Sequence, residues 1–336
     1  MNCVVVLLSI FCCFLQVRVS IASSLDCSKY ANDTEVLRSL PFYVAIDPSD
    51  RADYKTFATT YPNKTMILSL NIYNQSLVPP TIFCLQALAE IYIMDSTICD
   101  EQSSVCQLSS EIERWSESLS SLNILRTRVT HLPTSIGKLQ RLNTVKLWNN
   151  DLVTLPNTFS SLKLLSSLSI IFNQLKSLPK GFGMLNSLST IELNNNVNLR
   201  SIQSLNGLPN LITLSAINCS ITSIPINLPK LYFMEMTNNK ISNLNGIQTI
   251  GSQQDLTKYF LFSLNQIRAV PSEIASVNNL YIFHLDNNQL TNLPSTIFGY
   301  KALAVLYIQN NSFTSNVLRQ IVNKFKTTNP NMRLVF

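Results

Sequence analysis

Few residues in this sequence have the types and spacing that catalysis requires. The chain has only 2 histidines and 7 glycines, which leaves little material for imidazole chemistry or for a phosphate-binding loop. His284 and Asp286 alternate along one segment, and with Glu235 they could be imagined as an acid–base group. No nucleophile accompanies them, and His131 lies in a turn without a partner set by the sequence. We therefore expect no enzyme activity and no cofactor, and we assign both histidines surface or hydrogen-bonding roles.

The cysteines indicate disulfide bridges rather than a metal site. Five cysteines remain outside the N-terminal apolar run, which holds Cys3, Cys12 and Cys13, and four of the five precede the most regular part of the chain: Cys27, Cys84, Cys99 and Cys106. They can form two bridges with three possible connectivities, of which Cys27–Cys84 plus Cys99–Cys106 closes the shortest local loop. Zinc is the alternative, but there is no Cys-x-x-Cys spacing and no histidine nearby, so we expect no metal. Cys219 stands apart and is expected to be a small buried core residue.

The N-terminus predicts export. Residues 1–17 form a mostly apolar run of about the length of a signal-peptide core, and cleavage after Ala22 fits the preference for small side chains. An uncleaved signal anchor is the alternative. No second apolar run of about 18 residues follows, so we expect an extracellular, secreted chain without a transmembrane segment beyond the signal peptide at residues 1–22. Glycosylation acceptors of the form Asn-x-Ser/Thr agree with export and begin at Asn32, Asn63, Asn74, Asn218 and Asn310.

A repeat of about 23 residues organises most of the chain. The clearest copy is Leu142-x-x-Val145-x-Leu147-x-x-Asn150-x-Leu152-x-x-Leu155-Pro156-x-x-Phe159-x-x-Leu162. Other clear copies start at Leu119, Leu165, Leu188, Leu211, Leu231, Thr257, Leu280 and Leu303, and two weaker ones start at Ile67 and Leu88. This periodicity predicts about eleven repeats over residues 67–314, with an N-terminal cap at 23–66 and a C-terminal cap at 315–336.

The repeat predicts a solenoid. Leucines that alternate with other residues indicate a short strand whose leucines point inward. No single coil can bury its leucines alone, so the coils must stack and their strands must pair in parallel. A column of asparagines follows the strands and is expected to form a hydrogen-bond ladder between coils, because an unpaired buried amide costs about 1–3 kcal/mol. Its members are Asn150, Asn173, Asn196, Asn239, Asn265, Asn288 and Asn311, with Thr127 and Cys219 at equivalent positions.

These motifs resemble the leucine-rich-repeat family, typical class, whose second half has the pattern Leu-Pro-x-x-Ile/Phe-x-x-Leu, as at residues 132–139. The chain differs from the plant receptor type, which has Gly-x-Ile-Pro at this place. The resemblance implies an α/β fold: a curved leucine-rich-repeat solenoid with one parallel sheet on its concave face and irregular, 3-10 or short helical returns on its convex face. It is similar to secreted and receptor-ectodomain proteins, and it is weakly specific for function.

Outward-facing side chains of the strands predict a recognition surface on the concave face. Its N-terminal part is apolar and comprises Tyr73, Tyr92, Met94, Leu125, Trp148, Ile171 and Phe172. Its C-terminal part is more polar and includes Glu192, Glu235, His284, Asp286 and Tyr307. An exposed apolar patch of this size indicates a binding site, with Trp148 as the best candidate for its energetic centre. The alternative is that these side chains only pack against their neighbours and stabilise the sheet.

The charges favour a protein partner over nucleic acid. The formal net charge of +6 combines −7 in residues 23–118 with +12 in residues 119–336 and the single charge of Arg18. The basic residues are dispersed and mostly fall on the returning segments, whereas nucleic acid requires a clustered basic stripe with stacking aromatics. We expect a non-catalytic extracellular module that binds a protein or peptide ligand. The alternatives are an adhesive wall-associated protein that binds acidic polysaccharide and a secreted inhibitor of a hydrolase.

Overall fold

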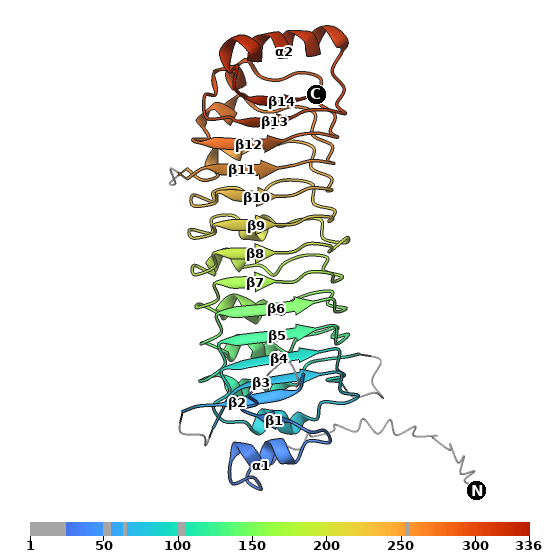
Figure 1. Ribbon diagram of the computed structural model, residues 1–336, viewed down its shortest axis with the longest axis vertical. Helices are drawn as coiled ribbons and strands as arrows, with labels where there is room; N and C mark the ends of the chain where they lie inside the picture. Colours follow the sequence, from blue (N-terminus) through green and yellow to red (C-terminus); the bar gives the residue numbers. More distant parts are fainter. Residues whose placement is uncertain (1–24, 50–54, 63–65, 100–104, 253–255) are drawn as a thin grey trace, which may run out of the picture.

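The computed structural model describes residues 25–49, 55–62, 66–99, 105–252 and 256–336. Within them the chain forms a solenoid with a single open sheet whose strand order follows the sequence (Figure 1). The strands are β1 (Ala45–Ile46), β2 (Phe57–Thr60), β3 (Ile67–Tyr73), β4 (Glu90–Met94), β5 (Ser121–Leu125), β6 (Thr144–Trp148), β7 (Ser167–Ser169), β8 (Thr190–Glu192), β9 (Thr213–Ser215), β10 (Phe233–Glu235), β11 (Lys258–Leu261), β12 (Leu280–His284), β13 (Val305–Tyr307) and β14 (Arg333–Val335).

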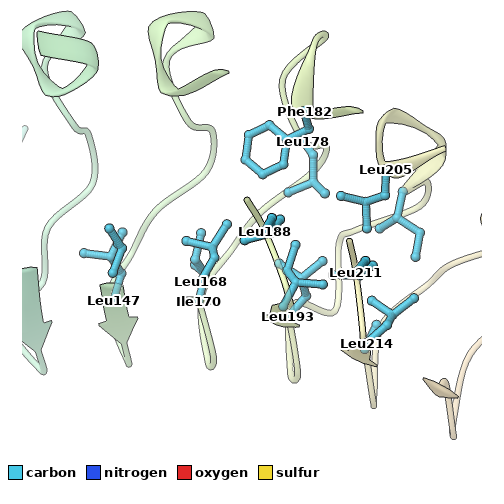
Figure 2. Packing of buried hydrophobic residues seen from close by; sticks show 14 of the residues in the cluster. Leu147, Leu168, Ile170, Leu178, Phe182, Leu188, Leu193, Leu205, Leu211 and Leu214 are labelled. Carbon is cyan, nitrogen blue, oxygen red and sulfur yellow. The ribbon is translucent and has the colours of Figure 1, made fainter. Parts of the chain in front are cut away.

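Each repeat forms one coil of the solenoid. In the clearest copy, Val145 and Leu147 on β6 are completely buried, and Pro156 leads into a 3-10 turn that buries Phe159. Phe159 stacks on Phe182 of the next coil at 5.8 Å between ring centroids, and Figure 2 shows the leucines of successive coils lying side by side. At roughly 1.5–3 kcal/mol per buried side chain, this stacking supplies the stability that a lone coil lacks. The predicted leucine-rich-repeat solenoid is confirmed.

Short 3-10 helices return the chain from one strand to the next, as the family resemblance implied. They are η1 (Pro80–Cys84), η2 (Ser110–Trp115), η3 (Thr134–Lys138), η4 (Asn157–Ser161), η5 (Phe182–Met184), η6 (Gln203–Leu205), η7 (Ile247–Thr249), η8 (Ser272–Ser276) and η9 (Ser295–Gly299). Gly137 in η3 allows a close approach between neighbouring turns, because a Cβ there would lie 2.5 Å from the backbone oxygen of Thr158. The backbones of η3 and η4 can therefore lie close together at this point.

A ladder of asparagine amides ties the coils together at the turn after each strand. The Oδ1 atom of Asn196 accepts a hydrogen bond from the backbone N–H of Leu175 (3.1 Å), and its Nδ2 group donates to the carbonyl oxygens of Ile170 (2.7 Å) and Leu193 (2.8 Å). The two bonds to the preceding coil, one accepted by Oδ1 and one donated by Nδ2, recur at Asn150, Asn173, Asn239, Asn265, Asn288 and Asn311. At Cys219 the thiol donates to the carbonyl of Leu193 instead, at 3.3 Å. The ladder satisfies backbone groups that the sharp turn would otherwise leave buried and unpaired.

The two ends of the solenoid depart from the repeat. Helix α1 (Asp33–Arg38) packs Val36 and Leu37 into the first part of the core. We predicted a wholly parallel sheet, but β2 pairs with β3 in antiparallel orientation. Helix α2 (Ser315–Thr328) closes the other end and buries Ile321 and Phe325. After α2 the chain turns back, and β14 adds one more parallel strand beside β13. The sequence did not predict β14, because these three residues lack the repeat pattern.

One core position differs from the repeat pattern. The pattern predicts Thr257 in the column of buried leucines, but Thr257 is exposed and Lys258 is completely buried there, in register with Leu280. The register shifts by one residue between β11 and β12, which moves Lys258 into the leucine column. Its ammonium group donates to the backbone oxygen of Asn278 at 2.6 Å. A polar partner of this kind is what makes a buried lysine tolerable.

Two disulfide bridges, Cys27–Cys84 and Cys99–Cys106, lie in the N-terminal part of the solenoid. The predicted signal peptide at residues 1–22 and the predicted acceptor Asn63 lie outside the described residues. In the part of the chain that the structure covers, none of the helices has the length and apolar character needed to cross a membrane.

Candidate functional site

The outward face of the sheet, which we call the sheet face, carries side chains in three columns that the strand register defines. The middle column contains Tyr92, Asn123, Lys146, Ser169, Glu192, Ser215, Glu235, Leu261, His284 and Tyr307. The last column follows two residues later and contains Tyr73, Met94, Leu125, Trp148, Ile171, Asn194, Ile217, Thr237, Ser263, Asp286 and Gln309. The first column precedes the middle one by two residues. Neighbours within a column are about 4.8 Å apart, so each column offers a continuous strip to a ligand.

Trp148 is held in place by a chain of hydrogen bonds on the sheet face. Its Nε1 group donates to the Ser169 hydroxyl at 2.6 Å, and that hydroxyl donates to Oε2 of Glu192, also at 2.6 Å. The ammonium group of Lys146 lies 5.6 Å from the centre of the Trp148 ring, within the range of a cation–π interaction. The indole therefore keeps one orientation and leaves part of its surface open to solvent.

The apolar patch predicted around Trp148 is present with one correction. Tyr73, Met94 and Ile171 are half-buried and keep surface for a ligand. Leu125, in contrast, is only 8% exposed, because it lies in register between the larger side chains of Met94 and Trp148. Leu125 therefore supports the patch from below rather than forming its surface.

Phe172 is the most exposed member of the patch, at 56%. It is the residue directly after the last-column residue Ile171. The residue at this position in each coil adopts a left-handed backbone conformation, with φ between 51° and 60°. We call this series the left-handed column; its members are Asn74, Asp95, Arg126, Asn149, Phe172, Asn195, Asn218, Asn238, Leu264, Asn287 and Asn310. Asparagine tolerates this conformation, whereas a bulky side chain is strained in it. Because this conformation recurs in eleven successive coils, the turn itself requires it, and Phe172 stands out only because a phenylalanine fills a position that asparagine mostly occupies.

The left-handed column was not predicted from the sequence, although paired asparagines such as Asn195-Asn196 were a signal for it. Side-chain amides of this column bond to one another: Asn218 donates to Asn195 at 2.8 Å, and Asn238 donates to Asn218 at 3.0 Å. The predicted glycosylation acceptors Asn74, Asn218 and Asn310 all lie in this column, at one edge of the sheet face. The acceptor Asn32 caps helix α1 instead and is exposed.

The burial of Asn123 is a second feature that the sequence did not predict, besides the left-handed column. It lies in the middle column between Tyr92 and Lys146, yet it is completely buried. Its Nδ2 group donates to the carbonyl oxygen of Ile91 and to the hydroxyl of Ser121, whereas its Oδ1 atom finds no partner among the described residues. Its burial depends on the size of the neighbouring side chains, so the repeat pattern contains no signal for it.

The C-terminal part of the sheet face carries four of the five predicted polar residues over β10–β13, whereas Glu192 lies on β8 and bonds to Ser169. The rings of His284 and Tyr307 lie 4.3 Å apart, and burial lowers the pKa of His284 although the nearby Asp286 acts in the opposite direction. Burial also raises the pKa of Glu235. Asp286 accepts hydrogen bonds from the Ser263 hydroxyl (2.6 Å) and from Asn287 (2.7 Å).

This arrangement does not resemble a catalytic relay. In a nucleophile–base–acid triad the imidazole lies between the hydroxyl and the carboxylate. Here the Ser263 hydroxyl bonds directly to Asp286, and His284 packs on Tyr307 instead. His131 is exposed and its Nδ1 atom lies 2.9 Å from the Thr130 hydroxyl, far along the chain from either carboxylate. The described residues also contain no group of three His, Cys, Asp or Glu side chains that could hold a metal ion.

Comparison with known proteins supports the fold. Residues 69–258 match the family model described as a leucine-rich repeat region. No curated protein sequence matches the chain. Similar solved structures include a plant peptide hormone receptor, RGFR1, in complex with RGF2 (20% identity, TM-score 0.54, 80% of this chain and 46% of that chain). Another is the Toll–Spatzle complex of Drosophila (21% identity, TM-score 0.61, 78% of this chain and 35% of that chain).

A third similar structure is the ectodomain of the receptor kinase GASSHO1/SCHENGEN3 from Arabidopsis thaliana in complex with CASPARIAN STRIP INTEGRITY FACTOR 2. It is 17% identical, with a TM-score of 0.51 over 86% of this chain and 41% of that chain. This chain thus spans less than half the length of the three chains compared. At these identities the likeness shows the fold alone. Together with the family model, which matches more than half of the residues, it shows that the chain belongs to the leucine-rich-repeat family.

Proposed function

We propose that the chain is an extracellular recognition module that binds a protein or peptide ligand through the sheet face, centred on Trp148. The observation that carries this proposal is the fixed, partly open indole of Trp148, with the exposed Phe172 at the end of the neighbouring strand segment. Binding energy in protein interfaces concentrates in such pre-oriented aromatic side chains, because little conformational freedom remains to be lost. Phe172 supports the same site, because a bulky ring occupies a left-handed position that asparagine fills in most other coils, and strain of this kind persists at functional sites.

Two further observations support the location and the kind of partner. The two disulfide bridges suit an oxidising compartment and agree with the predicted signal peptide. The similar receptors RGFR1, Toll and GASSHO1 were each solved in complex with a partner: RGF2, Spatzle and CASPARIAN STRIP INTEGRITY FACTOR 2. Leucine-rich-repeat proteins are generally binding modules rather than enzymes, which fits the absence of a relay at Ser263, His284 and Asp286 in the described part of the chain.

The test is selection of ligands from a phage-displayed library of random peptides on the purified full chain. The matched variants are the double substitution Trp148→Ala/Ile171→Ala on the sheet face and Leu164→Ala/Met184→Ala on the returning segments. Leu164 and Met184 are also large, exposed apolar residues, at 54% and 61%. Both variants should unfold at the temperature of the parent chain, within a few degrees.

Selected peptides should bind the Trp148→Ala/Ile171→Ala variant about thirtyfold more weakly, since truncating an interface centre costs about 2 kcal/mol or more. The Leu164→Ala/Met184→Ala variant should bind as the parent does. Equal affinity of all three proteins would refute the sheet face as the binding site. Attachment to acidic polysaccharide would instead weaken steeply between about 0.05 and 0.5 M salt and would not respond to either variant.

A further inference from the structure

The acidic residues of the C-terminal two thirds of the chain are not spread evenly. Residues 119–336 contain 18 basic and 6 acidic side chains. Three of the six acidic residues, Glu192, Glu235 and Asp286, lie on the sheet face between β8 and β12. The three columns of that stretch contain no lysine or arginine. A strongly basic region therefore presents a negatively charged strip on the surface where a ligand would lie.

Aromatic rings adjoin this strip. Phe233 and Tyr259 are neighbours in the first column, with ring centroids 6.4 Å apart, and Tyr281 meets Tyr259 edge to face at 6.3 Å. Glu235 follows Phe233 by two residues on the same strand, so its carboxylate lies on the same face about 6.7 Å further along. Among the described residues the carboxylate of Glu235 has neither a hydrogen bond nor an ion pair, unlike the hydrogen-bonded carboxylates of Glu192 and Asp286.

Leu261 lies at the centre of this arrangement, half-buried in the middle column. In register it has Glu235 on one side and His284 on the other, while Tyr259 precedes it and Ser263, which bonds to Asp286, follows it. Leu261 thus offers an apolar floor, and two carboxylates and two rings stand around it. Long cationic side chains fit such a place, because their alkyl stems cover apolar surface while their charged heads reach carboxylates and ring faces.

We propose that Leu261, Glu235, Tyr259, His284 and Asp286 form a subsite for an arginine or lysine side chain of the partner. This proposal rests on the proposed function, because the subsite lies on the same sheet face as Trp148. It adds that one residue of the ligand carries a positive charge. Glu235 is the charge that the ligand would pair. His284 stays neutral near pH 7, because burial lowers its pKa, and therefore does not compete as a cation. The absence of lysine and arginine from this stretch means that no side chain of its three columns blocks the subsite.

The test uses two libraries of short N-acetylated, C-amidated peptides that differ only at a central residue: arginine in one and its neutral isostere citrulline in the other. Retention of each library on the immobilised full chain is measured. The parent chain should retain the arginine library about tenfold better. Glu235→Gln should abolish this preference, and Leu261→Lys should also abolish it, because the new ammonium group would occupy the subsite. Glu273→Gln is the matched control, since Glu273 lies on the returning helix η8, and it should keep the preference.

Equal retention of the two libraries by the parent chain would overturn the proposal, and so would a preference that survives Glu235→Gln. Trp148→Ala separates this outcome from failure of the proposed function. If both the subsite and the proposed function hold, Trp148→Ala lowers the retention of both libraries but leaves their ratio unchanged. If Trp148→Ala changes nothing while Glu235→Gln removes the arginine preference, the subsite stands and the patch around Trp148 is not the binding centre.

Discussion

The indole Nε1 group of Trp148 donates a hydrogen bond to the hydroxyl of Ser169 across 2.6 Å. Because Ser169 also donates to Glu192, the hydroxyl is oriented and its lone pair faces the indole. We expect Ser169→Ala to release the ring and to weaken ligand binding about fivefold, the effect of losing about 1 kcal/mol. Titration calorimetry measures the affinity, and acrylamide quenching should reach Trp148 more easily in this variant.

The second tryptophan does not confuse the quenching experiment, because Trp115 is only 1% exposed and donates to the carbonyl of Leu85. Ser167→Ala is the control, since Ser167 lies on the same strand and face but does not contact the indole. Unchanged quenching in Ser169→Ala would show that packing, rather than this bond, orients Trp148.

Phe172→Asn should stabilise the fold and weaken binding. Asparagine occupies most positions of the left-handed column, and replacing a strained bulky residue there should gain about 1 kcal/mol in the free energy of unfolding. The lost ring should lower ligand affinity. Leu264→Asn provides the comparison: Leu264 has φ of 57° in the same column, so it should also gain stability, but it lies far from Trp148 and should leave affinity for the patch unchanged. Urea unfolding that shows no gain in either variant would remove strain as the explanation.

Asn196→Ala should destabilise the solenoid by about 3 kcal/mol, because it leaves buried backbone groups of Leu175, Ile170 and Leu193 without partners. Asn198→Ala is the matched control. Asn198 is exposed and makes a single bond to Gln174 at 3.2 Å, so its loss should cost less than about 0.5 kcal/mol. Denaturant titration of both variants checks the difference, and similar midpoints would contradict a structural role for the ladder.

Glu235→Gln should change stability in a way that depends on pH. Burial raises the pKa of Glu235 in the folded chain, so the folded state holds its proton more tightly than the unfolded state does. The stability that this carboxyl contributes is present below its unfolded pKa and is lost as pH rises through the folded pKa. Relative to the parent, Glu235→Gln should therefore be more stable at pH 7 than at pH 3, by up to about 0.5 kcal/mol. Urea unfolding at both pH values measures this, and a difference of opposite sign would show that Glu235 has a cationic partner.

The thiol of Cys219 should be inert in the folded chain. Burial raises its pKa to about 11, and the thiolate is the reactive form. Ellman's reagent should give the same signal with the native parent and with Cys219→Ala. In denaturant the parent should react with one more equivalent than Cys219→Ala does. Rapid labelling of the native thiol would mean that the coil around Cys219 opens readily.

The sequence alone determined the solenoid and the eleven coils from β3 to β13. It also determined, for almost every strand residue, whether its side chain points into the core or onto the sheet face. These features depend on the alternation of side chains along each strand and on contacts between adjacent coils. The residues of a single repeat and its neighbour specify both. For the same reason the repeat pattern by itself assigns Trp148, Ile171, Glu235 and Asp286 to one face of the sheet. The positions shared by all copies were sufficient for this assignment.

Only the tertiary structure decided what lies open on that face. Exposure depends on the sizes of side chains on neighbouring strands, which is why Leu125 and Asn123 proved buried. Pairing between strands also shifted the register at β11, which placed Lys258 in the core. It placed β14 beside β13, although the residues of β14 lack the repeat pattern. The grouping of Glu235 with Leu261 and Asp286 arises in the same way, because residues about 25 positions apart in the sequence become neighbours only when coils stack.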